Sequence, residues 1–132
     1  MLKYSPVGAK FSGSNADNDY IAERYSNVLL MKAEALYRLG QNTDEALRLV
    51  NQVRTRSNCA PFTELSLDKI EKERAREFIW ENQRRKDMIR FGSFFTEKTF
   101  YADGNTDKTK AIYPIPAQQI NANPNLKQNP GY

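Results

Sequence analysis

The acidic and basic residues best spaced to act together in this sequence lie in one charged segment, residues 73–92. Three glutamates recur there at every fourth residue, with arginines between and after them: Glu73, Glu77 and Glu81. On a helix this spacing stacks three carboxylates on one face, where like charges repel. The apolar residues Ile70 and Phe78 fall on the same face, so charge lies on the side that a helix normally buries.

Three kinds of chemistry fit this pattern. The carboxylates can be solvated, with surface ion pairs worth about 0.2–0.5 kcal/mol each. Two of them can form the acid and base of a glycosidase, whose carboxyl groups lie about 5–10 Å apart. They can also be held by arginines in a buried, bidentate network that fixes how the helix docks.

We favour the network over the solvated face, and both over catalysis. Catalytic carboxylates need environments that push their pKa values apart, whereas guanidiniums near every acid favour ionisation of all of them. The expected network consists of the following acids and arginines: Glu73, Arg74, Arg76, Glu77, Glu81, Arg84, Asp87 and Arg90.

Other catalytic and metal-binding classes lack their residues. The chain has no histidine, which excludes His-based triads and His-ligated zinc, and its single Cys59 forms neither an intrachain disulfide nor a thiolate cluster. The run Asp103-x-Asn105-x-Asp107 half-matches a calcium loop, but lysine and proline stand where that loop needs glycine and glutamate, so we interpret it as a polar turn. We therefore expect no catalytic residue, metal or cofactor.

Helical periodicity predicts an all-α architecture. Apolar residues recur at three and four over residues 22–39, with Gly40 ending that helix. A second helix is predicted over residues 43–57, with Asn42 as N-cap and Glu45 closing a capping box. The connection is short, so the two helices form an antiparallel pair, packed through these residues: Leu29, Leu30, Ala33, Leu36, Ala46, Val50 and Val53.

Two further helices carry the charged segment. The first begins after Ser66 as N-cap and runs to about Asn82; the second covers residues 84–91 and ends at Gly92. The chain then continues through an aromatic-rich stretch, whose exposed rings between Phe94 and Tyr101 could stack on sugars. Packing in a core is the more common fate of such rings.

The helix pair is a partial match to one tetratricopeptide unit. Ala46 occupies the small position of the second helix, but Glu34 stands where the first helix needs a small residue. A single unit cannot bury its own face, because solenoids are stabilised by stacking. We therefore expect a second, uncovered apolar face on the first helix, made of Leu30, Met31, Tyr37 and Leu39.

Residues 112–132 form a C-terminal strap rich in proline and asparagine. Its prolines and two Asn-Pro steps hold the chain extended or turned. Aliphatic and aromatic residues are spaced among these turns, which a disordered tail would not need. The strap is expected to contain a single helical turn over residues 117–120, after Pro116.

Four segments, in this order, together resemble the C-terminal part of the RagB/SusD family. They are the Arg24-Tyr25-Ser26-Asn27 start of the first helix with the following Val28–Leu36, the Ala46–Arg56 helix, the Glu73–Gly92 block and the Tyr113–Tyr132 ending. The resemblance implies an all-α, tetratricopeptide-containing lipoprotein on the outer membrane that hands glycans or other nutrients to a TonB-dependent transporter. It implies binding without hydrolysis.

Against that family pattern, this chain is expected to be a C-terminal fragment or the end of a split gene. It opens into polar sequence without an apolar leader or lipid-attachment cysteine, so we divide it into an irregular segment, residues 1–20, and a SusD-like helical region, residues 21–132. Ligand-contacting residues are not assigned, since the oligosaccharide or other nutrient would bind through the missing part. The alternative is a free-standing tetratricopeptide-like scaffold that binds a protein or peptide.

Charge and hydropathy argue against two further kinds of interaction, with nucleic acid and across a membrane. The net charge is +4, and no basic run is interleaved with aromatics, so a nucleic-acid partner is not expected. No apolar run approaches the length of a membrane span.

Overall fold

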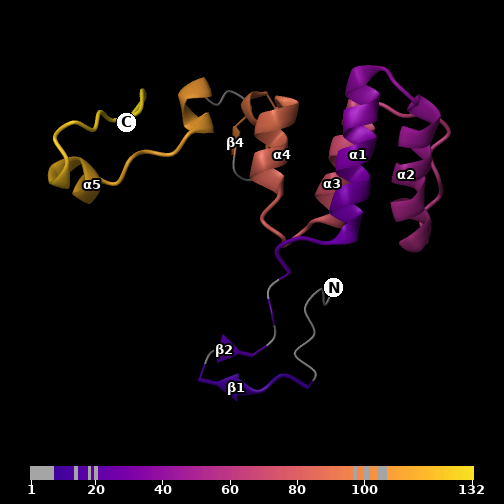
Figure 1. Cartoon of the computed structure of the whole chain (residues 1–132), viewed down its shortest axis with the longest axis horizontal. Coiled ribbons are helices and arrows are strands. Elements are labelled where there is room, and N and C mark those ends of the chain that lie inside the picture. The colour runs from indigo at the N-terminus through magenta and orange to yellow at the C-terminus, as the bar shows by residue number, and fades with distance from the viewer. Residues whose placement is uncertain are drawn as a thin grey trace. The chain divides into compact units, whose positions relative to one another are not determined.

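The computed structural model describes residues 8–13, 15–17, 19, 21–96, 98–99, 102–103 and 107–132. These residues are mostly helical, as the sequence predicts, with a few two-residue strands (Figure 1). The chain divides into two compact units, Met1–Arg84 and Arg85–Tyr132. Among the described helices, none is both long and apolar enough to cross a membrane.

The N-terminal segment contains a short β-ladder that the sequence does not predict. Strand β1 (Phe11–Ser12) pairs antiparallel with β2 (Asn15–Ala16). Gly13 turns the chain between them with a φ of +62°, a left-handed conformation that glycine adopts without steric cost. Asp17 closes the ladder, because its carboxylate accepts a hydrogen bond of 2.8 Å from the Lys10 amide.

Helices α1 (Tyr25–Leu39) and α2 (Thr43–Arg56) form the predicted pair. Gly40 ends α1 with a φ of +63°, as expected for a C-terminal glycine. The predicted capping box is wrong. Asn42 itself takes a left-handed backbone, whereas a capping side chain needs an extended one, and it makes no cap hydrogen bond. The Glu45 carboxylate instead accepts hydrogen bonds from Arg48 and Lys32.

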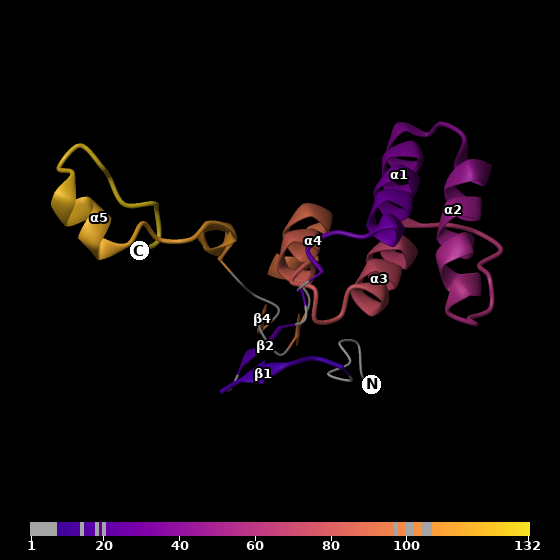
Figure 2. The same cartoon turned by 60° about the horizontal axis from the view of Figure 1, so that its bottom comes forward.

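The predicted interface between the two helices is confirmed for six of its seven residues, whereas Leu36 is only half-buried. Leu30, Ala33, Ala46 and Val50 have no exposed surface, and Leu29 and Val53 are buried beside them. Helix α1 packs on both α2 and α3 (Leu67–Glu77), as Figure 1 and Figure 2 show. The core-facing arc of α1 is therefore wider than the stripe seen in the sequence.

The predicted second apolar face of α1 needs correction at two of its four residues. Leu30 belongs to the core and Tyr37 is half-buried, whereas Met31 and Leu39 are exposed as predicted. The face that this chain leaves exposed, called here the outer face of α1, consists of Tyr25, Val28, Met31 and Leu39, each 47–69% exposed.

Helix α3 begins as predicted and ends earlier. The Ser66 hydroxyl accepts a hydrogen bond of 3.1 Å from the Lys69 amide, but the helix stops at Glu77 and not near Asn82. The Glu81 amide donates to the carbonyl of Phe78, and Trp80 and Asn82 take left-handed backbones with φ of +65° and +55°. A right-handed helix cannot continue through such residues.

Trp80 gives a test of backbone strain in this turn. A bulky residue at positive φ costs roughly 1–3 kcal/mol, and the Trp80 side chain is 78% exposed, so little burial offsets that cost. We expect Trp80→Gly to keep the unfolding free energy or to raise it by up to about 1 kcal/mol. Trp80→Ala retains the Cβ and is the control. Urea denaturation followed by circular dichroism measures both, and a glycine variant less stable than the alanine variant contradicts the idea.

The C-terminal unit contains the rest of the elements. Helix α4 (Arg84–Phe91) ends at Gly92 as predicted, and the 3-10 helix η1 (Ser93–Phe95) follows. Strands β3 (Lys98–Thr99) and β4 (Ala102–Asp103) pair antiparallel. The 3-10 helix η2 (Lys108–Ala111) and α5 (Ala117–Ala122) complete the elements, and α5 extends the predicted turn by two residues.

The structure describes only part of the aromatic-rich stretch and of the half-matched calcium loop. Phe94 is buried and meets the Phe95 ring edge-on at 5.4 Å between centroids, so these rings pack rather than face solvent. Phe100 and Tyr101 lie outside the described residues, as does Asn105 of the half-matched calcium loop. Asp107 caps η2, because its carboxylate accepts a 2.8 Å hydrogen bond from the Thr109 amide, and this bond lowers the pKa of Asp107.

The strap closes on itself through side chains that bond backbone groups. Gln128 pairs with both the amide and the carbonyl of Ile115, at 2.8 and 2.9 Å. The Tyr132 hydroxyl donates to the carbonyl of Ile112 at 2.9 Å, and Lys110 donates to the carbonyl of Gly131 at 2.8 Å. These bonds supply the partners that proline-rich chain cannot obtain from a helix or sheet.

Gly131 allows a test of this closure. Its φ is +88°, and a Cβ there would overlap the Thr109 side chain. Gly131→Ala should therefore loosen the strap by roughly 1–3 kcal/mol, seen as faster hydrogen exchange at the Ile115 amide. Gly92→Ala is the matched control, because Gly92 has the same φ but nothing within 4 Å of the added carbon. Equal exchange in the two variants would show that the overlap is relieved.

Candidate functional site

A single arginine ties the start of α1 to the end of α3. Arg24 stands at the N-cap position of α1; its Nε donates to the Glu81 carboxylate at 2.9 Å, and its Nη1 donates to the Glu77 carboxylate and to the Ser26 hydroxyl. Its Nη2 donates to the backbone carbonyl of Glu77. We call Arg24, Glu77 and Glu81 the Arg24 clamp.

The clamp also holds α2. The Arg56 Nη2 donates to both carboxylate oxygens of Glu77, at 2.7 and 2.8 Å. Glu77 and Glu81 are buried, with 7% and 3% of their side chains exposed, and Arg24 retains only 21%. Three helices are therefore joined at one buried carboxylate, where charge-assisted hydrogen bonds are strong.

Further ion pairs extend along α3. The Glu73 carboxylate accepts from Arg54 of α2 at 2.6 Å and from Arg76 at 2.8 Å. Arg84 pairs with Glu71 at 2.9 Å. These contacts join the buried acids of α3 to Arg54 of α2 and to Arg84, the residue that follows the turn after α3.

The predicted network is thus built from the predicted acids and from several unpredicted arginines. Glu73, Glu77 and Glu81 are buried and bonded to arginine, as the apolar stripe indicates. Arg74 donates to the Asn27 side chain at 2.9 Å, inside the core. Asp87 is buried and accepts from Arg90, one turn along α4, at 2.6 Å; this pair lies in the C-terminal unit.

Sequence reasoning missed Arg24, Arg54 and Arg56 as partners of these acids. One signal for Arg24 is present in the sequence. The residue before a helix is usually Ser, Thr, Asp or Asn, and a cation at a helix N-terminus opposes the helix dipole. An arginine there breaks the local rule, which indicates that a distant partner holds it.

The contacts of the clamp favour the charged form of Arg24. Burial by itself lowers the pKa of Arg24, but hydrogen bonds to Glu81 and Glu77 outweigh it, so the pKa is raised on balance. Arg24 and Arg74 also lie over the Phe78 ring, each 5.0 Å from its centroid.

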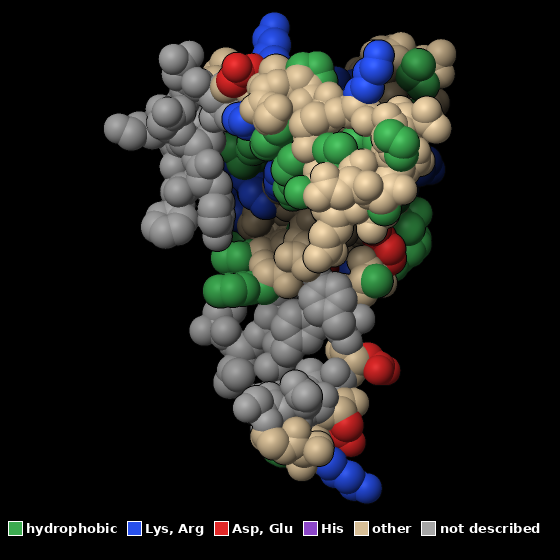
Figure 3. Space-filling model, turned by 90° about the vertical axis from the view of Figure 1, so that its left-hand side faces the viewer, with side chains coloured by type: hydrophobic (Ala, Val, Ile, Leu, Met, Phe, Trp, Pro, Cys, Tyr) green, Lys and Arg blue, Asp and Glu red, His purple; other side chains and the backbone are tan. Residues whose placement is uncertain are grey.

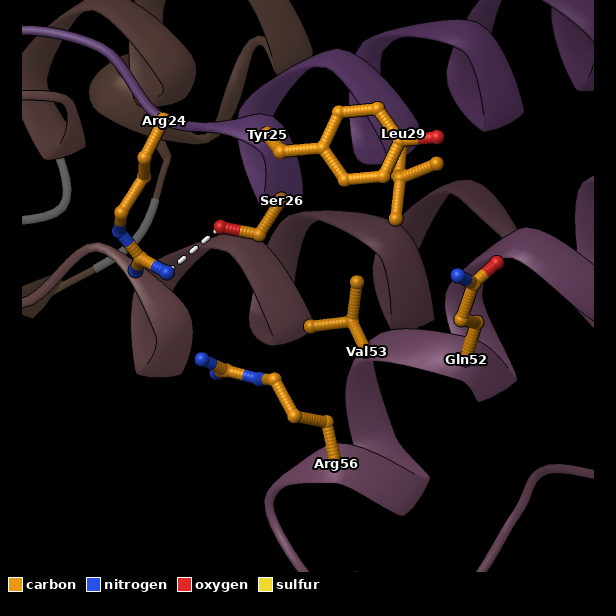
Figure 4. Close-up of a pocket in the computed structure, with 7 residues that line it drawn as sticks. All are labelled: Arg24, Tyr25, Ser26, Leu29, Gln52, Val53 and Arg56. Carbon is orange, nitrogen blue, oxygen red and sulfur yellow. Dashed lines mark hydrogen bonds between the residues drawn. The ribbon is translucent and has the colours of Figure 1, made fainter.

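A pocket of about 320 Å³ opens where α1 begins and α2 ends (Figure 4). It is lined by Arg24, Tyr25, Ser26, Leu29, Gln52, Val53 and Arg56. The figure shows apolar side chains of α1 and α2 between two polar ends, with Gln52 on one side and the guanidiniums on the other. The pocket wall includes Arg24 of the clamp and also Arg56, which is hydrogen-bonded to Glu77 of the clamp.

On the face drawn in Figure 3, the lysine and arginine side chains are scattered among hydrophobic and neutral groups and form no basic patch. Among the described residues, no group of three or more acids and cysteines is placed to hold a metal ion.

The described elements define a class: a tetratricopeptide-like helix pair locked to a third helix by buried arginine–glutamate pairs, followed by a helical unit with a closed strap. The family model of the SusD family matches residues 1–132, and the chain belongs to this family.

Similar proteins and similar solved structures support the same family assignment. The chain is 36% identical to the starch-binding protein SusD of Bacteroides thetaiotaomicron, over 88% of this chain and 22% of that protein. It is 34% identical to the SusD-like protein P38 of Formosa agariphila, over the whole chain and 28% of that protein. Surface glycan-binding protein A from Bacteroides uniformis aligns with a TM-score of 0.75 and 29% identity, over 87% of this chain and 28% of that one. The chain thus spans about a quarter of these relatives.

Proposed function

We propose that this chain is the C-terminal framework of a non-catalytic, glycan- or nutrient-binding lipoprotein of the outer membrane, working with a TonB-dependent transporter. The observation that carries the proposal is the family match over all 132 residues. Identity of 36% to a starch-binding protein supports glycans as the ligand class. The Arg24 clamp supports the framework role, because it joins three helices through buried charges.

A chimera tests this role. The segment of the Bacteroides thetaiotaomicron starch-binding protein that matches this chain is replaced by residues 1–132. A framework segment should be exchangeable, so the chimera should fold and bind starch within about threefold of the parent protein, a difference under 1 kcal/mol. It should release no reducing sugar beyond the parent.

Two controls make the outcome decisive. The same chimera with Arg24→Ala should lose its folding cooperativity, since the clamp is then broken. A chimera that folds but does not bind starch would show that this segment determines the ligand. Release of reducing sugar that disappears with Glu77→Gln, in a variant that keeps the circular dichroism of the parent chimera, would show an enzyme.

A further inference from the structure

We propose that the pocket between the start of α1 and the end of α2 binds one uncharged sugar unit, with Tyr25, Gln52 and Arg56 as its contacts. This rests on the proposed glycan-binding function, and it adds a binding site within this chain itself. The pocket volume of about 320 Å³ lies at the lower end of the usual range for ligand sites, roughly 300–1,000 Å³. A single ring fits that volume better than an oligosaccharide chain.

The chemistry of the walls matches the two faces of a sugar. Leu29 and Val53 provide an apolar floor beside the Tyr25 ring, which is 69% exposed and able to stack on the C–H face of a pyranose. Gln52 offers both a donor and an acceptor, and Arg56 offers planar paired donors. Adjacent hydroxyls of a sugar need such paired, planar partners.

The charge balance selects an uncharged ligand. Arg24 and Arg56 contribute two positive charges to the pocket wall. Directly behind them, Glu77 and Glu81 supply two negative charges, bonded to the same guanidiniums. An anionic ligand therefore meets no net positive charge, whereas a hydroxyl needs only the N–H donors.

The site is organised before any ligand arrives. The Arg56 Nη2 is held by both oxygens of Glu77, while 60% of the Arg56 side chain stays exposed. All three nitrogens of Arg24 already donate to Ser26, Glu77 and Glu81. Fixed side chains lose little entropy on binding, which favours affinity for a small ligand.

The test is an NMR titration of the full 132-residue chain with methyl glycosides of glucose, galactose and mannose, up to about 50 mM, well above a millimolar Kd. At least one glycoside should shift the amide resonances of residues 24–29 and 52–56, and these shifts should saturate as the glycoside concentration rises. Tyr25→Ala and Gln52→Ala should each weaken binding by about tenfold. Tyr113→Ala is the matched control, since Tyr113 is an equally exposed tyrosine, at 68%, of the C-terminal unit, and it should leave the Kd unchanged.

Glucuronate is similar in size to the glucoside but anionic, so it distinguishes a site for uncharged sugars from a site for acidic sugars. It should bind no more tightly than the glucoside; tighter binding would overturn the uncharged assignment. No saturable shift with any glycoside, or a Kd unaffected by Tyr25→Ala in a variant with parental circular dichroism, would overturn the pocket. Starch binding by the chimera is a separate readout, so the pocket can fail while the proposed function stands.

Discussion

Replacing Arg24 with alanine is expected to lower the unfolding free energy of the chain by about 3–5 kcal/mol. The substitution removes the guanidinium that bonds both Glu77 and Glu81, and taking one partner away from a buried ion pair is costly. It also frees the Glu77 carbonyl at the end of α3. A loss of this size is a large part of an ordinary domain stability of roughly 5–15 kcal/mol.

Two further variants keep this result measurable. Arg24→Lys retains the charge but loses the planar fork, so it should lie between the parent and the alanine variant. Arg48→Ala is the matched control, because Arg48 also makes two hydrogen bonds to one glutamate, but at the surface. It should leave stability almost unchanged. Urea denaturation gives all three values; equal losses for Arg24→Ala and Arg48→Ala would show that burial of the clamp contributes nothing.

Replacing Leu30 with alanine is expected to cost about 2–5 kcal/mol. Leu30 has no exposed surface and lies in the core that α1 shares with its neighbours. Removing its side chain loses transfer free energy and leaves a cavity among packed residues. The cost is large because interiors of this density relax only partly around a missing group.

Leu39 provides the matched control on the same helix. It is the same residue type, 67% exposed on the outer face of α1, so Leu39→Ala should change the unfolding free energy by less than about 0.5 kcal/mol. Thermal and urea denaturation of the two variants measure the difference. Similar losses at both positions would mean that the outer face is covered in solution, for example by a second copy of the chain.

Local signals in the sequence determined most of the secondary structure. Periodicity placed α1 and α2, and Gly40, Ser66 and Gly92 marked ends that the structure confirms. These signals work because helix caps and glycine turns depend on a few neighbouring residues. Ion pairs one turn apart, such as Arg90 with Asp87, are readable for the same reason.

The pairing of the charged residues was decided only by the tertiary structure. Glu77 and Glu81 could be expected to be buried and bound to arginine, since they share a stripe with Phe78. Their partner Arg24 lies 53 and 57 residues away in the sequence. No spacing rule reaches that far, because such a contact depends on how three helices pack.

The same limit explains the two errors on α1 and α3. A stripe shows which residues share a face, but it does not show how many neighbours a helix has, so Leu30 was assigned to an uncovered face. The end of α3 depends on the turn at Trp80 and on the bond from Arg24 to the Glu77 carbonyl. Local sequence sets the preference of each residue, and long-range contacts then override it where their free energy is larger.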